Sequence, residues 1–382
     1  MITSNDKQNQ RKNYNKKKLR NPGIDLVRII GMYTLIMDHF IYFGNAFIKF
    51  NKYKEQLNFI KNFTNWNNDG FALISGIVQF KSYKYSNLLH LWLTVFFYSV
   101  GIHLYIKIFK KEFKINNDIS IEFFPIIFRR YWYFTDYFGM YLYLPVINKG
   151  ISLLTKSEFK LVVISTIGIF VLWRDLKNPN VDVFNIKGGF SMIWLLTFYL
   201  TGAYIGKYNA IYFGIKKYIF CLVCILIYVS SSYIYIKVHN NQNYLDIKNY
   251  QKIFLLVLKR LMTKRYDSFL KIAQSITLCL FFLQITYNKV LSKIICNIGP
   301  LCFGIYLIHV HPFVIENVLK HIFDTDPNYQ SLNTIIFNIL LKSLKWFIFS
   351  ITIDYIRYLF FNLLRLRKIC IIIEKYIIKL FS

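Results

Sequence analysis

Two ionisable side chains, Arg28 and His39, stand inside the first long apolar segment of the chain, residues 24–46. An ionisable group within a membrane helix is costly to insert, so each is a candidate for a functional role. Ten residues separate them, and a step of eleven residues at about 100° each returns to within about 20° of the same direction. We therefore predict both side chains on one stripe of a helix, about 16 Å apart, with Asp25 one turn before Arg28.

This stripe could carry proton transfer at one end and anion binding at the other. A neutral imidazole takes a proton from a hydroxyl near pH 7, which makes His39 a candidate general base. A guanidinium pairs bidentately with phosphate, which makes Arg28 a candidate ligand for an anionic donor. Two simpler interpretations stay open. His39 could be a core histidine with satisfied hydrogen bonds, and Arg28 could extend toward lipid headgroups beside Asp25.

The composition is that of an integral membrane protein. Of 382 residues, 55% are hydrophobic and 19% aromatic, and the mean hydropathy is +0.34. Ten membrane helices of about 20 apolar residues would use about 200 positions, which leaves room for loops and two tails. A composition this apolar excludes a disordered chain. Only 6 Cys occur in 382 residues, which excludes a disulfide scaffold.

We predict an all-α fold, a polytopic integral membrane helical bundle of about ten transmembrane helices. The predicted spans are residues 24–46, 67–80, 86–109, a fourth span that ends near 148, 160–173, 188–206, 216–237, 268–288, 299–320 and 333–362. The chain then divides into a basic cytoplasmic tail (1–22), a transmembrane domain (23–362) and a basic C-terminal tail (363–382).

The net charge is strongly positive, +29, with 48 Lys and Arg against 19 Asp and Glu. The basic residues cluster at the chain ends and between apolar runs, which favours contact with membrane lipids and argues against nucleic acid as a partner. Seven of them precede the first span, so we expect the N-terminus in the cytoplasm. An even number of spans then places the C-terminus there too, and the polar segment 238–267 on the opposite face, against the membrane.

The segment GIDLVRIIGMYTLIMDHF resembles the first helix of the membrane acyltransferase 3 family, whose hallmark is an Arg, ten residues and a His. The pattern is matched at Arg28 and His39. Four further segments match in order: FALISGIVQF, YWYFTDYFGMYLYLPVIN, SMIWLLTFYLTGAYIGKY and GPLCFGIYLIHVHPF. The resemblance covers residues 24–362 and is similar to the branch that modifies capsule or exopolysaccharide.

This resemblance implies a multi-pass enzyme of the bacterial plasma membrane. Such an enzyme moves an acyl group, usually acetyl, from acetyl-CoA in the cytoplasm to a hydroxyl of a cell-surface glycan or its lipid-linked oligosaccharide precursor, without a metal. It also implies that Arg28 and His39 carry the activity. The family often has Arg in the loop after its Ser-Gly pair, whereas this chain has Lys81 and Lys84. We expect Arg28 and these lysines to hold the donor phosphates, the lysines as point charges.

Other polar residues are candidates for contacts with the acceptor. Tyr306 and His309 are three apart, which places them on one face of a helix. His309 could line the acceptor path or simply bond a neighbouring helix. Ser75, beside Gly76, could offer a hydroxyl, although small residues in membrane helices more often serve close packing.

Aromatic and cysteine residues have simpler interpretations. Trp132, Tyr133 and Tyr137 could stack on a sugar, but aromatic side chains are enriched at membrane interfaces, and we favour that location. The pair Cys221 and Cys224 stands in an apolar span without nearby ligands, so redox or zinc chemistry is disfavoured. Asp354 and Arg357 are expected to form a pair within one helix.

Two alternatives without acyl transfer stay open. A secondary transporter also places charges at mid-membrane, but it predicts inverted repeats, which the sequence does not show. A glycan flippase would be equally polytopic and basic but would not require Arg28 and His39 on one stripe. Within the enzyme hypothesis, His39 could act as a base in direct transfer or could itself accept the acyl group first.

Overall fold

The computed structural model describes residues 20–81, 83–109, 119–173, 182, 184–209, 216–240, 266–327 and 331–381. Within these ranges every regular element is a helix, which confirms the all-α class. Most of the predicted N-terminal tail and nearly all of the segment 238–267 lie outside them.

The helices that form the bundle are, in chain order, α2 (Pro22–Phe43), α3 (Ala46–Lys49), α4 (Lys54–Thr64), α5 (Asn67–Gln79), α6 (Tyr85–Phe109), α7 (Ser120–Phe123), α8 (Trp132–Leu153), α9 (Lys156–Ile167), α11 (Met192–Tyr208), α12 (Lys217–Asn240), α14 (Phe269–Gln284), α15 (Lys289–Ile298), α16 (Cys302–His309), α17 (Pro312–Asn317), α18 (Leu332–Leu363) and α19 (Leu366–Phe381). A π-helical turn (Gly168–Trp173) follows α9, and short 3-10 turns include Lys187–Gly189 and Gly299–Leu301. Each of the ten predicted apolar segments overlaps at least one of these helices.

Four described helices are long and apolar enough to cross a membrane. They are Pro22–Phe43, Tyr85–Phe109, Lys289–His309 and Leu332–Leu363. Two shorter apolar helices, Tyr218–Ile234 and Phe269–Gln284, accompany them. The chain is thus a helical integral membrane protein, while ten passes stay a prediction.

The ninth predicted span, 299–320, has the wrong boundaries. Its helix begins at Lys289, tightens into the 3-10 turn and ends at His309. A separate helix, α17, starts at Pro312, because proline lacks the N–H needed inside a helix but suits its first turn. His311 caps α17, and its Nδ1 accepts a hydrogen bond from the Phe313 N–H at 3.2 Å.

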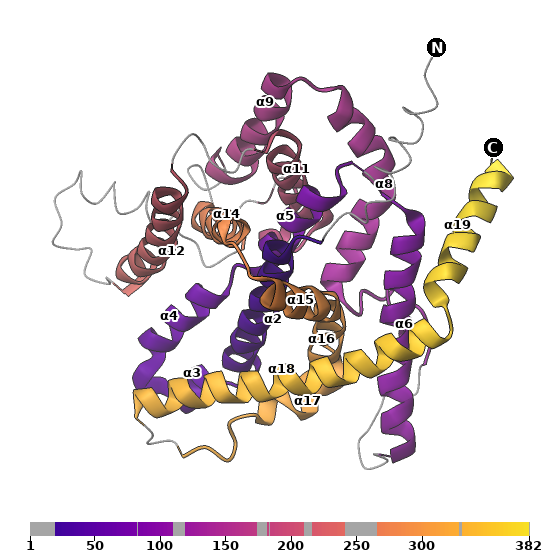
Figure 1. Ribbon diagram of the computed structural model, residues 1–382. Helices are drawn as coiled ribbons and strands as arrows, with labels where there is room; N and C mark the ends of the chain where they lie inside the picture. The colour runs from indigo at the N-terminus through magenta and orange to yellow at the C-terminus, as the bar shows by residue number, and fades with distance from the viewer. Residues whose placement is uncertain are drawn as a thin grey trace.

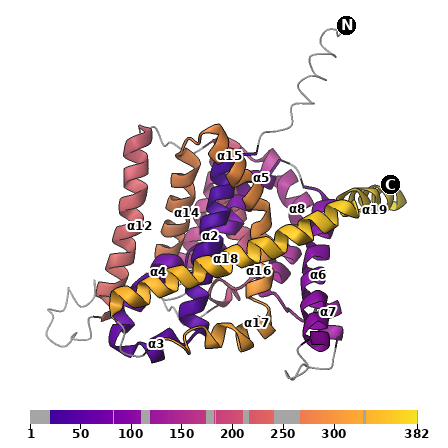
Figure 2. The same ribbon diagram turned by 60° about the horizontal axis from the view of Figure 1, so that its bottom comes forward.

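Helix α2 runs through the middle of the bundle, and α18 lies across one face of it in both views (Figures 1 and 2). The apolar side chains of α2 join both buried clusters of the core. Val27 packs in the cluster that includes α5, α8, α11 and α14, whereas Ile36 and Phe40 pack with residues of α16 and α18. Both halves of the core therefore position the stripe that carries Arg28 and His39.

Helices α5 and α11 approach each other closely at two glycines. A Cβ atom at Gly76 would lie 2.0 Å from the Tyr199 carbonyl oxygen, and one at Gly202 would lie 2.0 Å from that of Leu73. Only a residue without a side chain fits at such a contact, as is usual between membrane helices. Close packing for the Ser75–Gly76 pair is confirmed at Gly76.

Candidate active site

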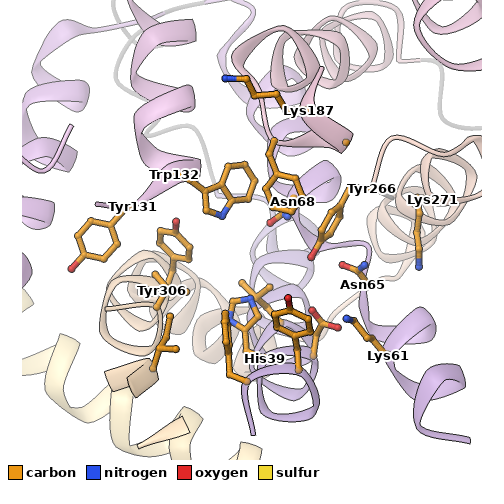
Figure 3. Close-up of a pocket in the computed structure, with 18 of the residues that line it drawn as sticks. His39, Lys61, Asn65, Asn68, Tyr131, Trp132, Lys187, Tyr266, Lys271 and Tyr306 are labelled. Carbon is orange, nitrogen blue, oxygen red and sulfur yellow. The ribbon is translucent and has the colours of Figure 1, made fainter. Parts of the chain in front are cut away.

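A cavity of about 1070 Å³ opens among the ends of several helices and contains His39 (Figure 3). Its walls come from α2, α4, the start of α8, the turn at 187–190, α14 and α16. The volume is at the upper end of the range typical for small-molecule sites. The cavity combines aromatic side chains with amides and cations, so it suits a polar ligand.

His39 presents its imidazole to this cavity. The His39 Nδ1 atom is buried and has no hydrogen-bond partner among the described residues. Its ring lies beside Phe43 and His309, with centroid distances of 5.1 and 5.0 Å. The interpretation of His39 as a core histidine with satisfied hydrogen bonds therefore does not fit.

His309 supports the ring of His39 from α16. It is fully buried, and its Nδ1 lies 2.9 Å from the Ile305 carbonyl oxygen. A carbonyl only accepts hydrogen bonds, so Nδ1 carries the proton and Nε2 is left as an acceptor. That Nε2 has no partner in the described part of the chain. His309 itself does not line the cavity, but it contacts two residues that do, His39 and Tyr306.

Trp132 and Tyr306, two of the candidates for acceptor contacts, both line the cavity (Figure 3). The Tyr306 hydroxyl is buried without a described hydrogen-bond partner. Trp132 packs on Phe190 at a centroid distance of 4.5 Å, so its ring is held at the cavity wall. Tyr137, one of the aromatic residues predicted at the membrane interface, is buried against other helices of the bundle.

Several wall residues escaped prediction from the sequence. Asn62 and Asn65 are buried, and Lys271 donates to the Asn62 carbonyl oxygen at 2.6 Å and to Gln274 Oε1 at 3.1 Å. The signal was present in the sequence as a lysine inside an apolar segment and as a cluster of asparagines at 62–68. Local periodicity could not show that α4 and α14 bring them to the same cavity as His39.

Arg28 lies away from this cavity, toward the other end of α2. Its Nη1 donates to Asp25 Oδ1 at 2.6 Å, and Arg20 binds the same carboxylate. The Arg28 side chain keeps 28% of its surface exposed, so it is partly accessible. Because α2 is one unbroken helix, Arg28 and His39 stand about 16 Å apart on it, as the spacing predicts.

A second cavity, of about 660 Å³, opens at the opposite end of α5. Asn68, at the start of α5, lines the first cavity, whereas Lys81, just after its end, lines the second. Lys149 and Lys207 share the second cavity with Lys81. Lys84 lies outside its lining, although its backbone is fixed by Tyr141, whose hydroxyl donates to the Lys84 carbonyl oxygen at 3.0 Å. Of the predicted donor residues, Lys81 lines this second cavity, whereas Arg28 and Lys84 line neither cavity.

A row of aromatic side chains with polar tips connects the two ends. The Tyr306 ring lies 6.2 Å from that of Tyr133, which stacks at 6.4 Å on Tyr137. Gln79 Nε2 donates to the Tyr137 hydroxyl at 2.9 Å, and Asn148, which lines the second cavity, donates to the Gln79 carbonyl oxygen at 3.0 Å. The interior between the cavities is therefore polar as well as aromatic.

The remaining candidates lie outside both cavities. Ser75 donates to the Phe71 carbonyl oxygen of its own helix at 3.0 Å and lines neither cavity. Cys221 and Cys224 are free thiols. In the described ranges, no three His, Cys, Asp or Glu side chains are grouped so that they could hold a metal ion.

Glu122 positions one cation of the cavity wall. This buried carboxylate binds the guanidinium of Arg130 and accepts from the Ser99 hydroxyl at 2.6 Å, and His311 Nε2 faces it at 3.9 Å. Burial alone would raise the pKa of Glu122, but the neighbouring His311, Ser99 and Arg130 outweigh it, and the pKa falls below its usual value. Glu122 is therefore held ionised, and Arg130 is held in place.

The fold and the site together define a helical membrane protein with an imidazole exposed in a polar interior cavity. A family model described as an acyltransferase domain, that of acyltransferase 3, matches residues 21–353. The chain belongs to this family and is a membrane acyltransferase. No curated protein and no solved structure matches it.

The ion pair of Glu122 predicts a pH-dependent stability. A carboxyl group with a lowered pKa in the folded chain stabilises the fold above its unfolded pKa, about 4.5, and loses that effect as the pH falls through the folded value. We expect Glu122→Gln to lower the thermal midpoint at pH 7 and to have a progressively smaller effect as the pH falls below 4.5 and through the folded pKa, where wild-type Glu122 also becomes neutral. Thermal unfolding in detergent across this pH range measures it. If Glu122→Gln lowered the thermal midpoint equally at pH 7 and at the acidic end of the range, that result would contradict the ionised state of Glu122.

Proposed function

We propose that this membrane acyltransferase transfers an acetyl group from acetyl-CoA to a hydroxyl of a cell-surface polysaccharide or its lipid-linked precursor. One observation carries the proposal. His39 lines a cavity of polar and aromatic side chains and has a buried ring nitrogen without a described hydrogen-bond partner, and the same helix holds Arg28. A base without an internal partner, set beside groups suited to sugar hydroxyls, is what transfer to a hydroxyl requires.

The opposite end of the bundle offers the charges that a coenzyme A donor needs. Lys81 and Lys149 line the second cavity, and Arg28 is accessible at the same end of the bundle. Cations of this kind bind phosphate groups, Lys as a point charge and Arg through paired N–H groups. The row through Tyr137 and Tyr133 leads from there to Tyr306 and the cavity of His39. This arrangement supports a donor that enters at one end and reacts at the other.

In the proposed reaction His39 takes the proton of the acceptor hydroxyl. The hydroxyl oxygen then attacks the thioester carbonyl, the carbon–sulfur bond breaks, and the thiolate leaves with a proton. The buried His309 fixes the position of the His39 ring through their contact. Transfer through an acyl group held on His39 is the alternative route, and retention of labelled acetyl by the enzyme without acceptor would reveal it.

We also propose that the N-terminus faces the cytoplasm and that the cavity of His39 opens on the other side of the membrane. The segments after α2, α6 and α12 all contribute to this cavity, through Lys61, Arg130 and Tyr266. A cytoplasmic N-terminus would place these three connecting segments outside. Asn241 and Ser82, which would suit a labelling test by their position in the loops, lie outside the described residues.

His39→Ala should abolish acetyl transfer while the protein stays folded. Losing a general base commonly lowers the rate by about 10² to 10⁴. Incorporation of label from acetyl-CoA into membrane glycan measures the rate, and the thermal midpoint checks the fold. His321→Ala is the matched control, since His321 is exposed, bonds Asp324 and does not line the cavity. Near-normal transfer by His39→Ala would remove the central claim.

Arg28→Lys should act mainly on the donor. Lysine keeps the charge but loses the paired N–H groups, so we expect the KM for acetyl-CoA to rise about tenfold and kcat to change less. Steady-state kinetics in membranes separate the two constants, with Arg367→Lys, on the exposed side of α19, as control. A collapse of kcat at unchanged KM would instead place Arg28 at the chemical step.

The orientation predicts which face a membrane-impermeant reagent reaches. Lys52 lies in the turn before α4, on the side of the His39 cavity, and Ser157 lies in the first turn of α9, on the other side; both are exposed. In a background without the 6 native cysteines, Lys52→Cys should react with an impermeant maleimide on intact cells and Ser157→Cys only after lysis. The reverse pattern would exchange the donor and acceptor faces.

A further inference from the structure

The cavity around His39 carries a large excess of positive charge. Six cationic side chains line it: Lys54, Lys61, Arg129, Arg130, Lys187 and Lys271. Among the described lining residues, Asp38 is the one carboxylate. A cleft of one sign with apolar walls concentrates the field and attracts ligands of the opposite sign.

Three of these cations are already engaged by the protein. Arg129 pairs with Asp136 at 2.9 Å, Arg130 pairs with Glu122, and Lys271 is bonded to Asn62 and Gln274.

The other three, Lys54, Lys61 and Lys187, form no ion pair with a described residue. Lys61 is half-buried, and its ammonium lies 4.3 Å from the centre of the Tyr42 ring. Charge at these positions is therefore available to a ligand.

The same cavity also holds neutral polar groups that lack partners. The Asn65 side-chain oxygen, both polar atoms of the Asn62 side chain and the Tyr306 hydroxyl are buried, and none has a hydrogen-bond partner in the described part of the chain. A buried polar group without a partner is costly unless a ligand supplies one. Together with the aromatic faces of Trp132 and Tyr266, these groups suit the hydroxyls and ring faces of a sugar.

We propose that the acceptor is an anionic glycan, whose carboxylate or phosphate groups bind Lys61 and Lys187. This proposal rests on the proposed function and adds the chemical class of its acceptor. Figure 3 shows Lys61 beside Asn65 on one side of the cavity, with His39 at its base and Lys187 across from them. An acidic group held by Lys61 places the neighbouring hydroxyls of the sugar within the same cavity as the His39 imidazole.

The phosphates of the donor are the competing ligand for these lysines. The second cavity, with Lys81 and Lys149, offers separate cations for the donor at the far end of α5. If the acceptor cavity recognises a glycan, removing Lys61 must weaken glycan binding and leave acetyl-CoA binding unchanged. If this cavity instead binds the donor, removing Lys61 must weaken acetyl-CoA binding and leave glycan binding unchanged.

Binding to the purified full-length protein in detergent tests the proposal. The probes are a galacturonic acid trisaccharide against its methyl ester, glucose 1-phosphate against glucose, and acetyl-CoA, each titrated by calorimetry. We expect at least one acidic probe to bind about tenfold or more tightly than its neutral partner, and less so at high salt. Lys61→Gln and Lys187→Gln should remove this preference. Lys52→Gln, an exposed lysine on the same side outside the cavity lining, should keep it.

Equal binding of the acidic and neutral probes, or no binding of either acid, would overturn the proposal. So would a loss of acetyl-CoA affinity in Lys61→Gln, which would assign the cations to the donor. Because binding is measured without turnover, a failure of acetyl transfer would count against the proposed function alone, and the preference for charge would be judged separately.

Discussion

The need to satisfy charged groups inside a membrane bundle governs how these helices meet. Asp25 is fully buried, and Arg28 of the same helix and Arg20 before it neutralise its carboxylate. Asp354 is equally buried and bonds Arg357 one turn later at 2.7 Å. A charge left without a partner at such a position would be costly, so each acidic group fixes the basic group beside it.

These pairs also fix helices that are far apart in the sequence. The Tyr98 hydroxyl of α6 donates to Asp354 Oδ1 at 2.7 Å, which joins α6 to α18. A Cβ atom at Gly304 of α16 would lie 1.8 Å from the same carboxylate oxygen, so α16 approaches α18 at a position where only glycine fits. The helix that carries Tyr306 and His309 is thereby held in place, and with it one wall of the cavity.

The cavity of His39 departs from this rule of paired polar groups. Around it, Arg129, Arg130 and Lys271 find partners within the chain, whereas Asp38, the His39 ring, Asn65 and Tyr306 keep buried polar atoms without a described partner. Local departures of this kind are expected where a protein binds or transforms a ligand. The engaged cations differ from Lys61 in the same way, because Lys61 forms no ion pair with a described residue. The proposed chemistry at His39 and the proposed class of acceptor both rest on groups without partners.

The sequence by itself determined whatever depends on neighbours along one helix. Apolar run lengths predicted the all-α membrane class, the eleven-residue step placed Arg28 and His39 on one helix, and a spacing of three predicted the pair of Asp354 and Arg357, which the structure confirms. Local spacing could not separate Arg28 from the cavity of His39 or bring His309 against its ring. It could not assemble the cationic wall either. Those contacts join residues from distant segments, and the packing of whole helices decides them, as at the close approach of α5 and α11.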